Sequence, residues 1–179
     1  MKFFLSLISL FLMPLLTKAQ VSPYAGQESQ EIKALTTEEI GGFLTGQGMG
    51  FAKAAELNHH PGPKHVLDLA KQLTLTKDQI AKTTNIFEQM QDDAIQLGKL
   101  IVDNEESIDA LFSSPPVDEE ELRTLVANIA SLQGELRFVH LRAHLEMKKL
   151  LSTAQVKKYD ELRGYGAKAD SKSHQHNHH

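Results

Sequence analysis

Residues 76–111 read TKDQIAKTTNIFEQMQDDAIQLGKLIVDNEESIDAL, and this stretch decides the fold. Its seam positions recur in steps of three and four residues, a spacing that predicts one helix with a packed face. The first set of seam positions is Ile80, Phe87, Ala94, Ile101 and Ile108, and the alternate set is Thr83, Met90, Leu97, Asn104 and Leu111. At about 1.5 Å per residue, this helix should extend for roughly 55 Å.

A second long helix should return along the first. Pro115-Pro116 stops the helical pattern, and Asp118 with Glu121 three positions later predicts a capping box that opens the next helix. The second helix repeats the spacing of apolar residues seen in the first, and only Glu146 interrupts it. Its apolar positions are Leu122, Leu125, Ile129, Leu132, Leu136, Val139, Ala143 and Leu150. Two long helices joined by a short turn that contains proline are expected to pack antiparallel as an αα-hairpin.

The same four-residue signal occurs at both ends of this hairpin. Thr76-Lys77-Asp78-Gln79 follows Leu75, and Ser152-Thr153-Ala154-Gln155 follows Leu151. In each, a hydroxyl residue is expected to accept from a backbone N–H at a helix start, while the glutamine three positions on returns to the capping residue. The second copy predicts a last helix that begins at Ser152 and carries Val156, Tyr159 and Leu162.

Short helices should precede the hairpin. A capping box at Thr36–Glu39 predicts a first helix to about Leu57, although it contains five glycines, which are unfavourable inside helices. Three of them recur every four residues, which indicates either a close helix crossing or a frayed or bent helix; they are Gly42, Gly46 and Gly50. Residues 58–64 form a predicted turn, and a short helix follows from about Pro63 to Leu73. The expected fold is all-α, a long antiparallel helical hairpin with short flanking helices.

Residues 1–19 have the pattern of a cleaved signal peptide. Lys2 precedes an apolar run, and Thr17-Lys18-Ala19 offers small residues before a cleavage site at Gln20. The alternative is an uncleaved N-terminal anchor. Cleavage would release a protein to the periplasm with a flexible arm at 20–34, a helical domain at 35–165 and a disordered, His-rich tail at 166–179.

The composition of the mature chain excludes some classes of protein. Without residues 1–19, 17 basic and 23 acidic residues give a net charge of about −6, which disfavours a nucleic-acid partner. There is no cysteine, so the chain must be stabilised by helix packing without disulfides. Aromatic residues make up only 6%, which suits a thin bundle of long helices.

The sequence resembles the Spy/CpxP group of periplasmic proteins. Besides the two Leu-Thr-x-x-Gln motifs, in which Ser152 replaces threonine, the stretches that carry the resemblance are Ala55–Asn58, Pro61–Pro63, His65–Ala70, Gly134–Arg137, His140–Leu145 and Tyr159–Tyr165. The resemblance implies an ATP-independent chaperone of the envelope stress response that binds unfolded or misfolded envelope proteins as a cradle-shaped homodimer. Such a chaperone requires no cofactor. The resemblance also implies an architectural role for the motif residues, which are Leu75, Thr76, Gln79, Leu151, Ser152 and Gln155. Alternatively, the resemblance fits a heavy-metal-binding or metal-sensing protein, or a module that docks on a membrane sensor kinase or regulator.

Several histidines are candidate metal ligands. His140 and His144 share one helical face with Met147 nearby, a donor set that suits zinc, copper or nickel. His65 could complete the site, whereas His59 and His60 are weaker candidates. The alternative interpretation is two half-exposed histidines paired with Glu135 or Glu146, and a helix-start role for His65. The tail, with four histidines in its last six residues, could bind transition metals loosely.

No catalytic constellation stands out, and the chain is not expected to be an enzyme. Gly46-Gln47-Gly48-Met49-Gly50 follows no predicted strand, so it does not fit a dinucleotide-binding loop. The acidic cluster Asp118–Glu121 is explained by the favourable interaction of negative charge with a helix N-terminus.

Overall fold

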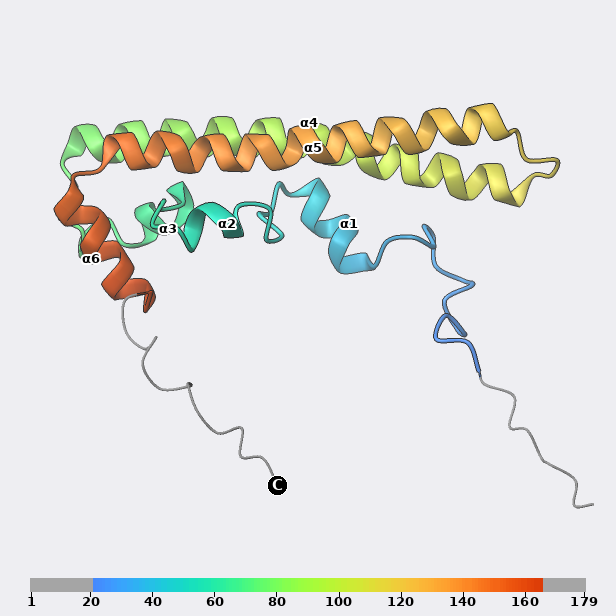
Figure 1. Cartoon of the computed structure of the whole chain (residues 1–179), viewed down its shortest axis with the longest axis horizontal. Coiled ribbons are helices and arrows are strands. Elements are labelled where there is room, and N and C mark those ends of the chain that lie inside the picture. The colour runs from blue at the N-terminus through green and yellow to red at the C-terminus, as the bar shows by residue number, and fades with distance from the viewer. Residues whose placement is uncertain (1–20, 166–179) are drawn as a thin grey trace, which may run out of the picture.

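The computed structural model describes residues 21–165, which contain helices and no strand (Figure 1). The helices are α1 (Thr37–Leu44), α2 (Lys53–Glu56), α3 (Pro63–Asp68), α4 (Lys77–Ser113), α5 (Glu119–Leu150) and α6 (Thr153–Arg163). The predicted all-α class and the long helical hairpin are confirmed. Over the described range, no helix combines the length and the apolar character needed to cross a membrane.

α4 and α5 lie side by side and antiparallel, and they form the hairpin predicted from the seam spacing (Figure 1). Of the predicted seam positions on α4, only Ile80 is exposed, and every predicted apolar position of α5 is buried or half-buried. The turn differs from the prediction in one detail. The Asp118 carboxylate alone accepts from the N–H groups of Glu120 and Glu121, at 2.9 and 3.2 Å, in place of a reciprocal capping box.

The three other predicted capping boxes are confirmed. The hydroxyl groups of Thr36, Thr76 and Ser152 each accept from the backbone N–H three residues on, and the side chains of Glu39, Gln79 and Gln155 each accept from the capping N–H. Because the start of α4 and the end of α5 lie at the same end of the hairpin, the boxes at Thr76 and Ser152 are neighbours in space.

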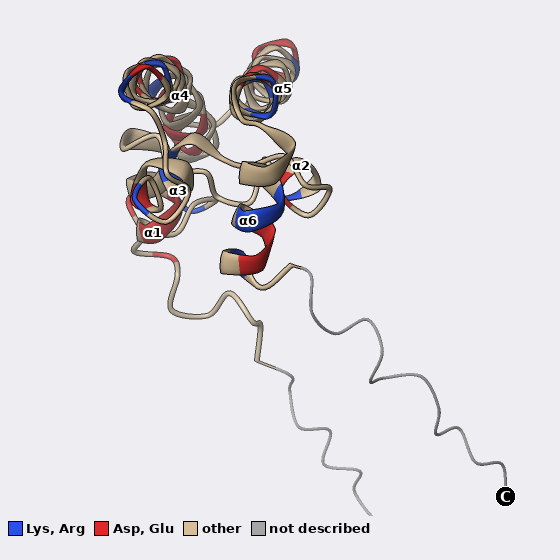
Figure 2. Ribbon diagram, turned by 90° about the vertical axis from the view of Figure 1, so that its left-hand side faces the viewer, with Lys and Arg blue, Asp and Glu red and all other residues tan. Residues whose placement is uncertain are grey.

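The N-terminal helices form a second layer below the hairpin (Figure 2). α1 and α3 pack on α4, while α2 packs on α5, and α6 crosses the end of the hairpin. The helix predicted from Thr36 to about Leu57 is interrupted after Leu44, and the bent alternative is the closer description. The backbone φ angle is positive at Gly46 (65°), Met49 (40°) and Gly50 (80°), which a right-handed helix does not allow.

Of the three glycines on the predicted face, only Gly46 makes a close approach to another helix, and it does so from the loop after α1. A Cβ on Gly46 would lie 3.0 Å from the Gln91 carbonyl oxygen, so the loop after α1 rests directly on α4. From the other side, Gly98 of α4 is covered by the end of α1, and a Cβ there would collide with the Phe43 carbonyl. Gly98, which lies outside the predicted glycine face, therefore sets the spacing between the two layers.

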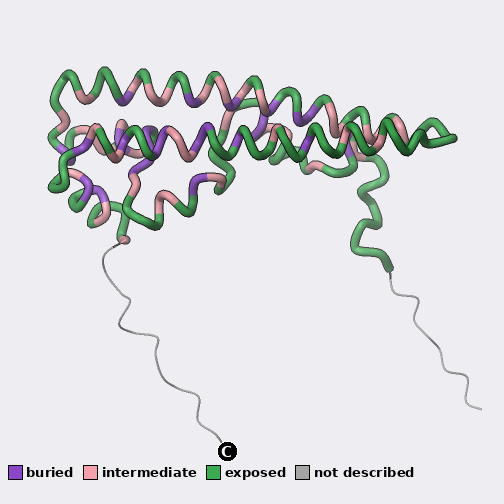
Figure 3. Tube along the Cα trace, turned by 45° about the horizontal axis from the view of Figure 1, so that its top comes forward, coloured by how far each residue is buried: buried purple, intermediate pink, exposed green. Residues whose placement is uncertain are grey.

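Within residues 21–165 there are two hydrophobic cores, both away from the hairpin tip (Figure 3). The first joins α1, α4 and α5 and contains Ile32, Phe43, Met90, Ala94, Ile101, Val102, Leu136, Val139 and Ala143. The second lies under α6 and contains Val66, Leu73, Met147, Leu151, Val156 and Tyr159. No residue between 103 and 128 is buried, so beyond the contact of Lys33 with Asp109 the tip of the hairpin is a bare pair of helices.

Packing begins within the segment predicted as a loose arm. Ile32 is only 4% exposed and belongs to the first core. Next to it, the Lys33 ammonium lies 2.7 Å from a carboxylate oxygen of Asp109 on α4. The helical domain therefore starts at about Ile32. The predicted signal peptide and the residues of the tail from 166 onward lie outside the described residues.

Candidate functional site: an outer groove and a histidine cavity

A shallow groove runs between α4 and α5 and is lined by these two helices alone. It consists of two hollows of about 350 and 220 Å³ that share Leu100. Its apolar residues are Leu97, Leu100, Leu132, Phe138 and Val139. Leu100 is 47% exposed and Phe138 is 54% exposed, so large apolar side chains face solvent here. We call this feature the outer groove.

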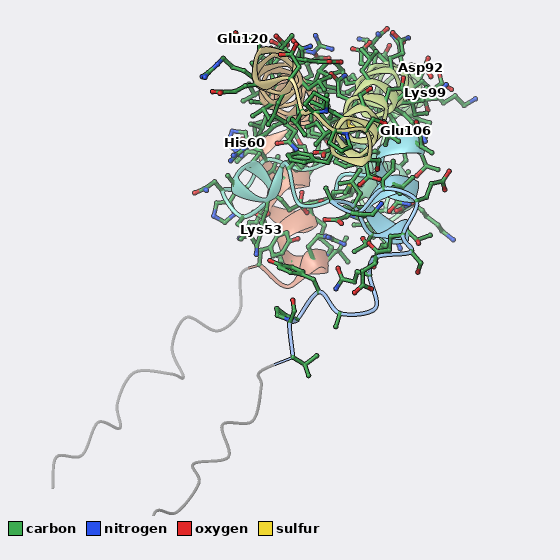
Figure 4. The ribbon with its side chains drawn as sticks, turned by 90° about the vertical axis from the view of Figure 1, so that its right-hand side faces the viewer. Lys53, His60, Asp92, Lys99, Glu106 and Glu120 are labelled. Atoms are coloured by element: carbon green, nitrogen blue, oxygen red, sulfur yellow. The ribbon has the colours of Figure 1, made fainter. Side chains whose placement is uncertain are left out.

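Charged side chains border the outer groove. The Arg142 guanidinium lies 2.8 Å from a carboxylate oxygen of Asp93 across the two helices, and Glu135 lies on the same rim. Asp92, Lys99 and Glu106 lie on the side of α4 away from α5 and do not line the groove (Figure 4). Apolar contacts surrounded by charge allow an apolar partner to bind while the surface stays soluble.

A second, separate hollow lies between the two layers. It has a volume of about 490 Å³ and is lined by Thr45, Gly46, Gln47, Gly48, Ala52, Gly62, Pro63, Lys64, His65, Phe87, Met90, Gln91, His140 and His144. The lining comes from the loops before α2 and α3, the first turn of α3, the middle of α4, and two successive turns of α5. We call it the histidine cavity.

His140 is buried in the wall of this cavity. Its side chain stacks on Phe51 with 5.9 Å between the ring centroids and 10° between the planes. The residue is 3% exposed, and its buried Nε2 has no hydrogen-bond partner. Burial, and next the nearby His144, lower the pKa of the His140 imidazole below its ordinary value, which favours the neutral ring.

His144 is held by the loop that precedes α3. Its Nδ1–H donates to the His60 carbonyl oxygen at 2.7 Å, since a carbonyl can only accept. The ring packs so closely on Gly62 that a Cβ there would lie 2.9 Å from His144 Cε1. Figure 4 shows His60 just below α5. Burial lowers the pKa of His144, while the bond to His60 and the Glu56 carboxylate oppose that shift.

Glu56 joins the second layer to α6 and to Tyr165, which lies just after that helix. Its Oε1 accepts from the hydroxyl groups of Tyr159, at 2.6 Å, and Tyr165, at 2.9 Å, and it lies 3.4 Å from Arg163 Nε. Its Oε2 lies 3.7 Å from Nδ1 of His144. Burial and the bond to Glu56 raise the pKa of the Tyr159 phenol above its ordinary value of 10.0.

Sequence reasoning missed this role of Glu56. The residue and both tyrosines lie in stretches that carry the family resemblance, but Glu56 is 103 and 109 residues away from them. The local signal was a single glutamate between Ala55 and Leu57 in a short, half-apolar stretch.

The predicted metal ligands come together only in part. His140, His144 and His65 line the same cavity. Met147 does not line it, because its side chain is fully buried in the second core together with Val66 and Tyr159. The nearest charged group to His65 is Asp68, 3.6 Å from its Nδ1. Over residues 21–165, no group of three or more His, Cys, Asp or Glu side chains is arranged to hold a metal ion. The donor set is short of the four ligands that structural zinc takes.

The alternative pairing of these histidines with Glu135 or Glu146 is wrong. His140 contacts Phe51, His144 contacts His60 and Glu56, and both rings are buried. The Glu146 carboxylate instead lies 3.8 Å from Arg142 Nε. Of the weaker candidates, His59 pairs with Asp160, and the His60 ring nitrogen Nδ1 lies 2.7 Å from the Asn58 carbonyl oxygen. The His-rich tail lies outside the described residues.

Comparison with protein-family models, with curated proteins and with solved structures finds no match for this chain.

Proposed function

We propose that this protein is an ATP-independent chaperone of the Spy/CpxP type that holds unfolded or misfolded envelope proteins in the periplasm. The outer groove carries the proposal, because it exposes Leu100 and Phe138 beside the charged groups of Asp93, Glu135 and Arg142. An extended client segment that carries an apolar side chain every few residues can lie along the narrow groove between α4 and α5.

Capture on this groove is weak and reversible. Burial of one large apolar side chain contributes about 1.5–3 kcal/mol, so a few side chains give affinities around the micromolar range after the cost of association. A client can therefore leave without a nucleotide-driven step, and the protein needs no catalytic residue and no cofactor.

Export fits this role. Residues 1–19 should be removed during secretion, and the periplasmic product should begin at Gln20. Mass spectrometry of the protein from a periplasmic extract tests this; a product that retains Met1 and the leader contradicts it.

A second copy completes the proposed cradle. The bare hairpin tip exposes Phe112 (59%), Val117 (38%) and Val126 (52%), and a two-helix arm of this kind gains stability when a partner covers it. Sedimentation equilibrium of the mature protein should give twice the monomer mass.

Aggregation of a denatured model protein tests the chaperone function. The client is diluted from denaturant, without nucleotide, in the presence of the mature protein, and light scattering is followed. Scattering should fall as the chaperone approaches molar excess. Unchanged scattering at several-fold excess contradicts the proposal.

Metal binding is the second candidate function, favoured by three imidazoles around one cavity. It has weaker support, because the described residues offer fewer donors than a zinc site needs. Calorimetry with zinc, copper and nickel on a variant whose tail histidines are replaced by serine isolates the cavity from the tail. Binding tighter than about 100 μM, or about −5.5 kcal/mol, that disappears in His144→Asn would support this function. Docking on a membrane sensor kinase, the third possibility, is tested by pull-down from membranes.

A further inference from the structure

A third hollow lies between the loop that joins α1 to α2 and the middle of α5. Its volume of about 460 Å³ lies within the range of roughly 300–1,000 Å³ typical of ligand pockets. It shares no lining residue with the outer groove or with the histidine cavity. Among the described residues, Arg137 is the only charged residue that lines it, and we call it the arginine hollow.

Arg137 differs from the other arginines of the chain in having no counter-charge. The chain contains four arginines, and three of them pair with carboxylates: Arg123 with Glu119 at 3.2 Å, Arg142 with Asp93 at 2.8 Å and Arg163 with Glu56 at 3.4 Å. Within residues 21–165, Arg137 has no such pair. The residue is exposed, so an anion from solvent can reach its guanidinium group.

Met49 and Phe51 form an apolar wall opposite Arg137. The Phe51 ring is held by its stack on His140, with 5.9 Å between the ring centroids. The backbone φ angle of Met49 is 40°, an uncommon value for a residue with a side chain and one that is found at ligand clamps. The Met49 thioether packs on Gly42, where a Cβ would lie 2.7 Å from its sulfur. The wall is therefore fixed before any ligand arrives.

Gly134 leaves open space on α5 beside this wall. Glycine is unfavourable inside a helix, and Gly98 on α4 is explained by the close approach of the Phe43 carbonyl. A Cβ on Gly134, by contrast, would meet no atom within 4 Å, so no contact among the described residues explains this glycine. The missing side chain allows a flat group to approach the helix closely.

The chemistry of the lining favours an aromatic anion. The planar guanidinium fork of arginine matches the two oxygens of a carboxylate and stays charged at every physiological pH. No carboxylate lines the arginine hollow, so nothing in its wall repels an anion. Thioethers and aromatic side chains make favourable contacts with a bound ring.

We propose that the arginine hollow binds a small aromatic carboxylate, whose carboxylate group pairs with the Arg137 guanidinium and whose ring lies between Gly134 and the wall of Met49 and Phe51. This site is separate from the groove that captures clients.

The test uses 2-naphthoate and its neutral analogue 2-naphthalenemethanol as probes of the mature protein at neutral pH and low salt, with binding followed by probe fluorescence. 2-Naphthoate should bind in a saturable way, and 2-naphthalenemethanol should bind about fivefold more weakly because it lacks the charge. Sodium chloride at about 0.5 M should reduce this difference, since salt screens an ion pair at the surface.

Arg137→Gln removes the proposed partner of the carboxylate. It should weaken the binding of 2-naphthoate about fivefold and leave that of 2-naphthalenemethanol within about twofold. Arg123→Gln is the matched control, because it removes the same charge from the same helix at a position that does not line the arginine hollow. It should leave the affinity of both probes unchanged.

A second pair of variants tests the position of the ring. Gly134→Leu places a side chain in the hollow and should reduce the binding of both probes at least about fivefold. Gly41 is also a helical glycine with open space around it, but it does not line the hollow, so Gly41→Leu should leave both affinities unchanged. Phe138→Ser, in the outer groove, should likewise have no effect.

Three results would overturn the proposal. The first is no saturable binding of 2-naphthoate, and the second is an unchanged ratio of the two probe affinities in Arg137→Gln. The third is an affinity for 2-naphthoate that falls as the protein concentration rises, which would assign the hollow to a second copy of the chain. None of these results bears on the aggregation assay, so this site and the chaperone function fail separately.

Discussion

Gln79 and Gln155 exchange a pair of side-chain hydrogen bonds across the base of the hairpin. Nε2 of Gln79 donates to Oε1 of Gln155 at 2.9 Å, and Nε2 of Gln155 donates to Oε1 of Gln79 at 3.0 Å. Each amide also donates to a neighbouring carbonyl, that of Leu150 or Leu73, at 3.3 Å. The two repeated motifs therefore cap their own helices and join α4 to α6.

Replacement of either glutamine should destabilise the fold by more than the loss of a cap. Gln79→Ala and Gln155→Ala should each lower the free energy of unfolding, measured in urea, by about 1–3 kcal/mol, because the partner amide is left without a hydrogen bond in a part-buried position. The double variant should cost less than the sum of the two single ones, with a coupling of about 0.5 kcal/mol or more.

Glu39→Ala is the matched control for this pair. It removes a capping box at Thr36 that is exposed and has no partner glutamine, so it should cost about 1 kcal/mol or less. Additive costs in the double variant, or an equal cost in Glu39→Ala, contradict a joint role of the two motifs.

Gly98→Ala should be strongly destabilising, because the new Cβ would collide with the Phe43 backbone carbonyl. The cost should reach a few kcal/mol, as for other overpacked cores. Gly134→Ala on α5 is the control, since a Cβ there meets nothing within 4 Å and alanine is the better helix former. It should raise the free energy of unfolding by about 0.5–1 kcal/mol, and a similar loss in both variants would contradict the packing described here.

The burial of His140 should make stability fall in mild acid. Burial and the nearby His144 hold its pKa below the ordinary value of 6.5, so the unfolded chain binds a proton at a higher pH than the folded chain. The stabilising contribution is complete above about pH 6.5 and is lost as the pH falls towards the lower pKa of the folded state. A decrease of about 1 kcal/mol in the free energy of unfolding lowers Tm by about 2–4 °C in a domain of this size.

Thermal unfolding of the mature protein between pH 7.5 and pH 5 measures this effect. The decrease in Tm should be smaller in His140→Phe than in the wild type. An identical decrease in both proteins would show that this imidazole does not contribute.

Tyr159→Phe should destabilise the junction between the second layer and α6. The substitution keeps the ring, but Oε1 of Glu56 loses its 2.6 Å donor and is left with Tyr165 and Arg163. The expected cost is about 1–3 kcal/mol in chemical unfolding. Tyr24 is 72% exposed, so Tyr24→Phe should change stability by less than about 0.5 kcal/mol; equal effects would contradict the role of Glu56.

The parts of the fold that could be predicted are those with local signals. The capping residues Thr76 and Ser152 mark helix starts within one residue, and Pro115-Pro116 ends α4 close to Ser113. The seam spacing depends only on helical periodicity, which explains why Ala94, Ile101, Leu136 and Val139 were found as core.

The parts that could not be predicted depend on contacts between distant segments. His140 and His144 flank the seam of α5 and would be half-exposed on an isolated hairpin. The loop around His60 and Gly62 covers His144, and Phe51 stacks on His140. No local pattern indicates where these two segments lie. The break after Leu44 likewise follows from the fit of Gly46 against Gln91 of α4.

The most direct test of the proposed function compares client binding by groove and control variants. Leu100→Ser and Phe138→Ser change exposed side chains of the outer groove, while Leu57→Ser changes a side chain that is 52% exposed in the second layer. All three should fold with nearly wild-type stability, because exposed substitutions rarely exceed about 0.5 kcal/mol.

Fluorescence anisotropy of a labelled, permanently unfolded client measures the affinity of each protein. The account predicts that the double variant Leu100→Ser/Phe138→Ser binds the client at least about tenfold more weakly than the wild type, since two apolar contacts are lost, whereas Leu57→Ser binds like the wild type. Equal affinity of the double variant and the wild type would contradict client capture on the outer groove.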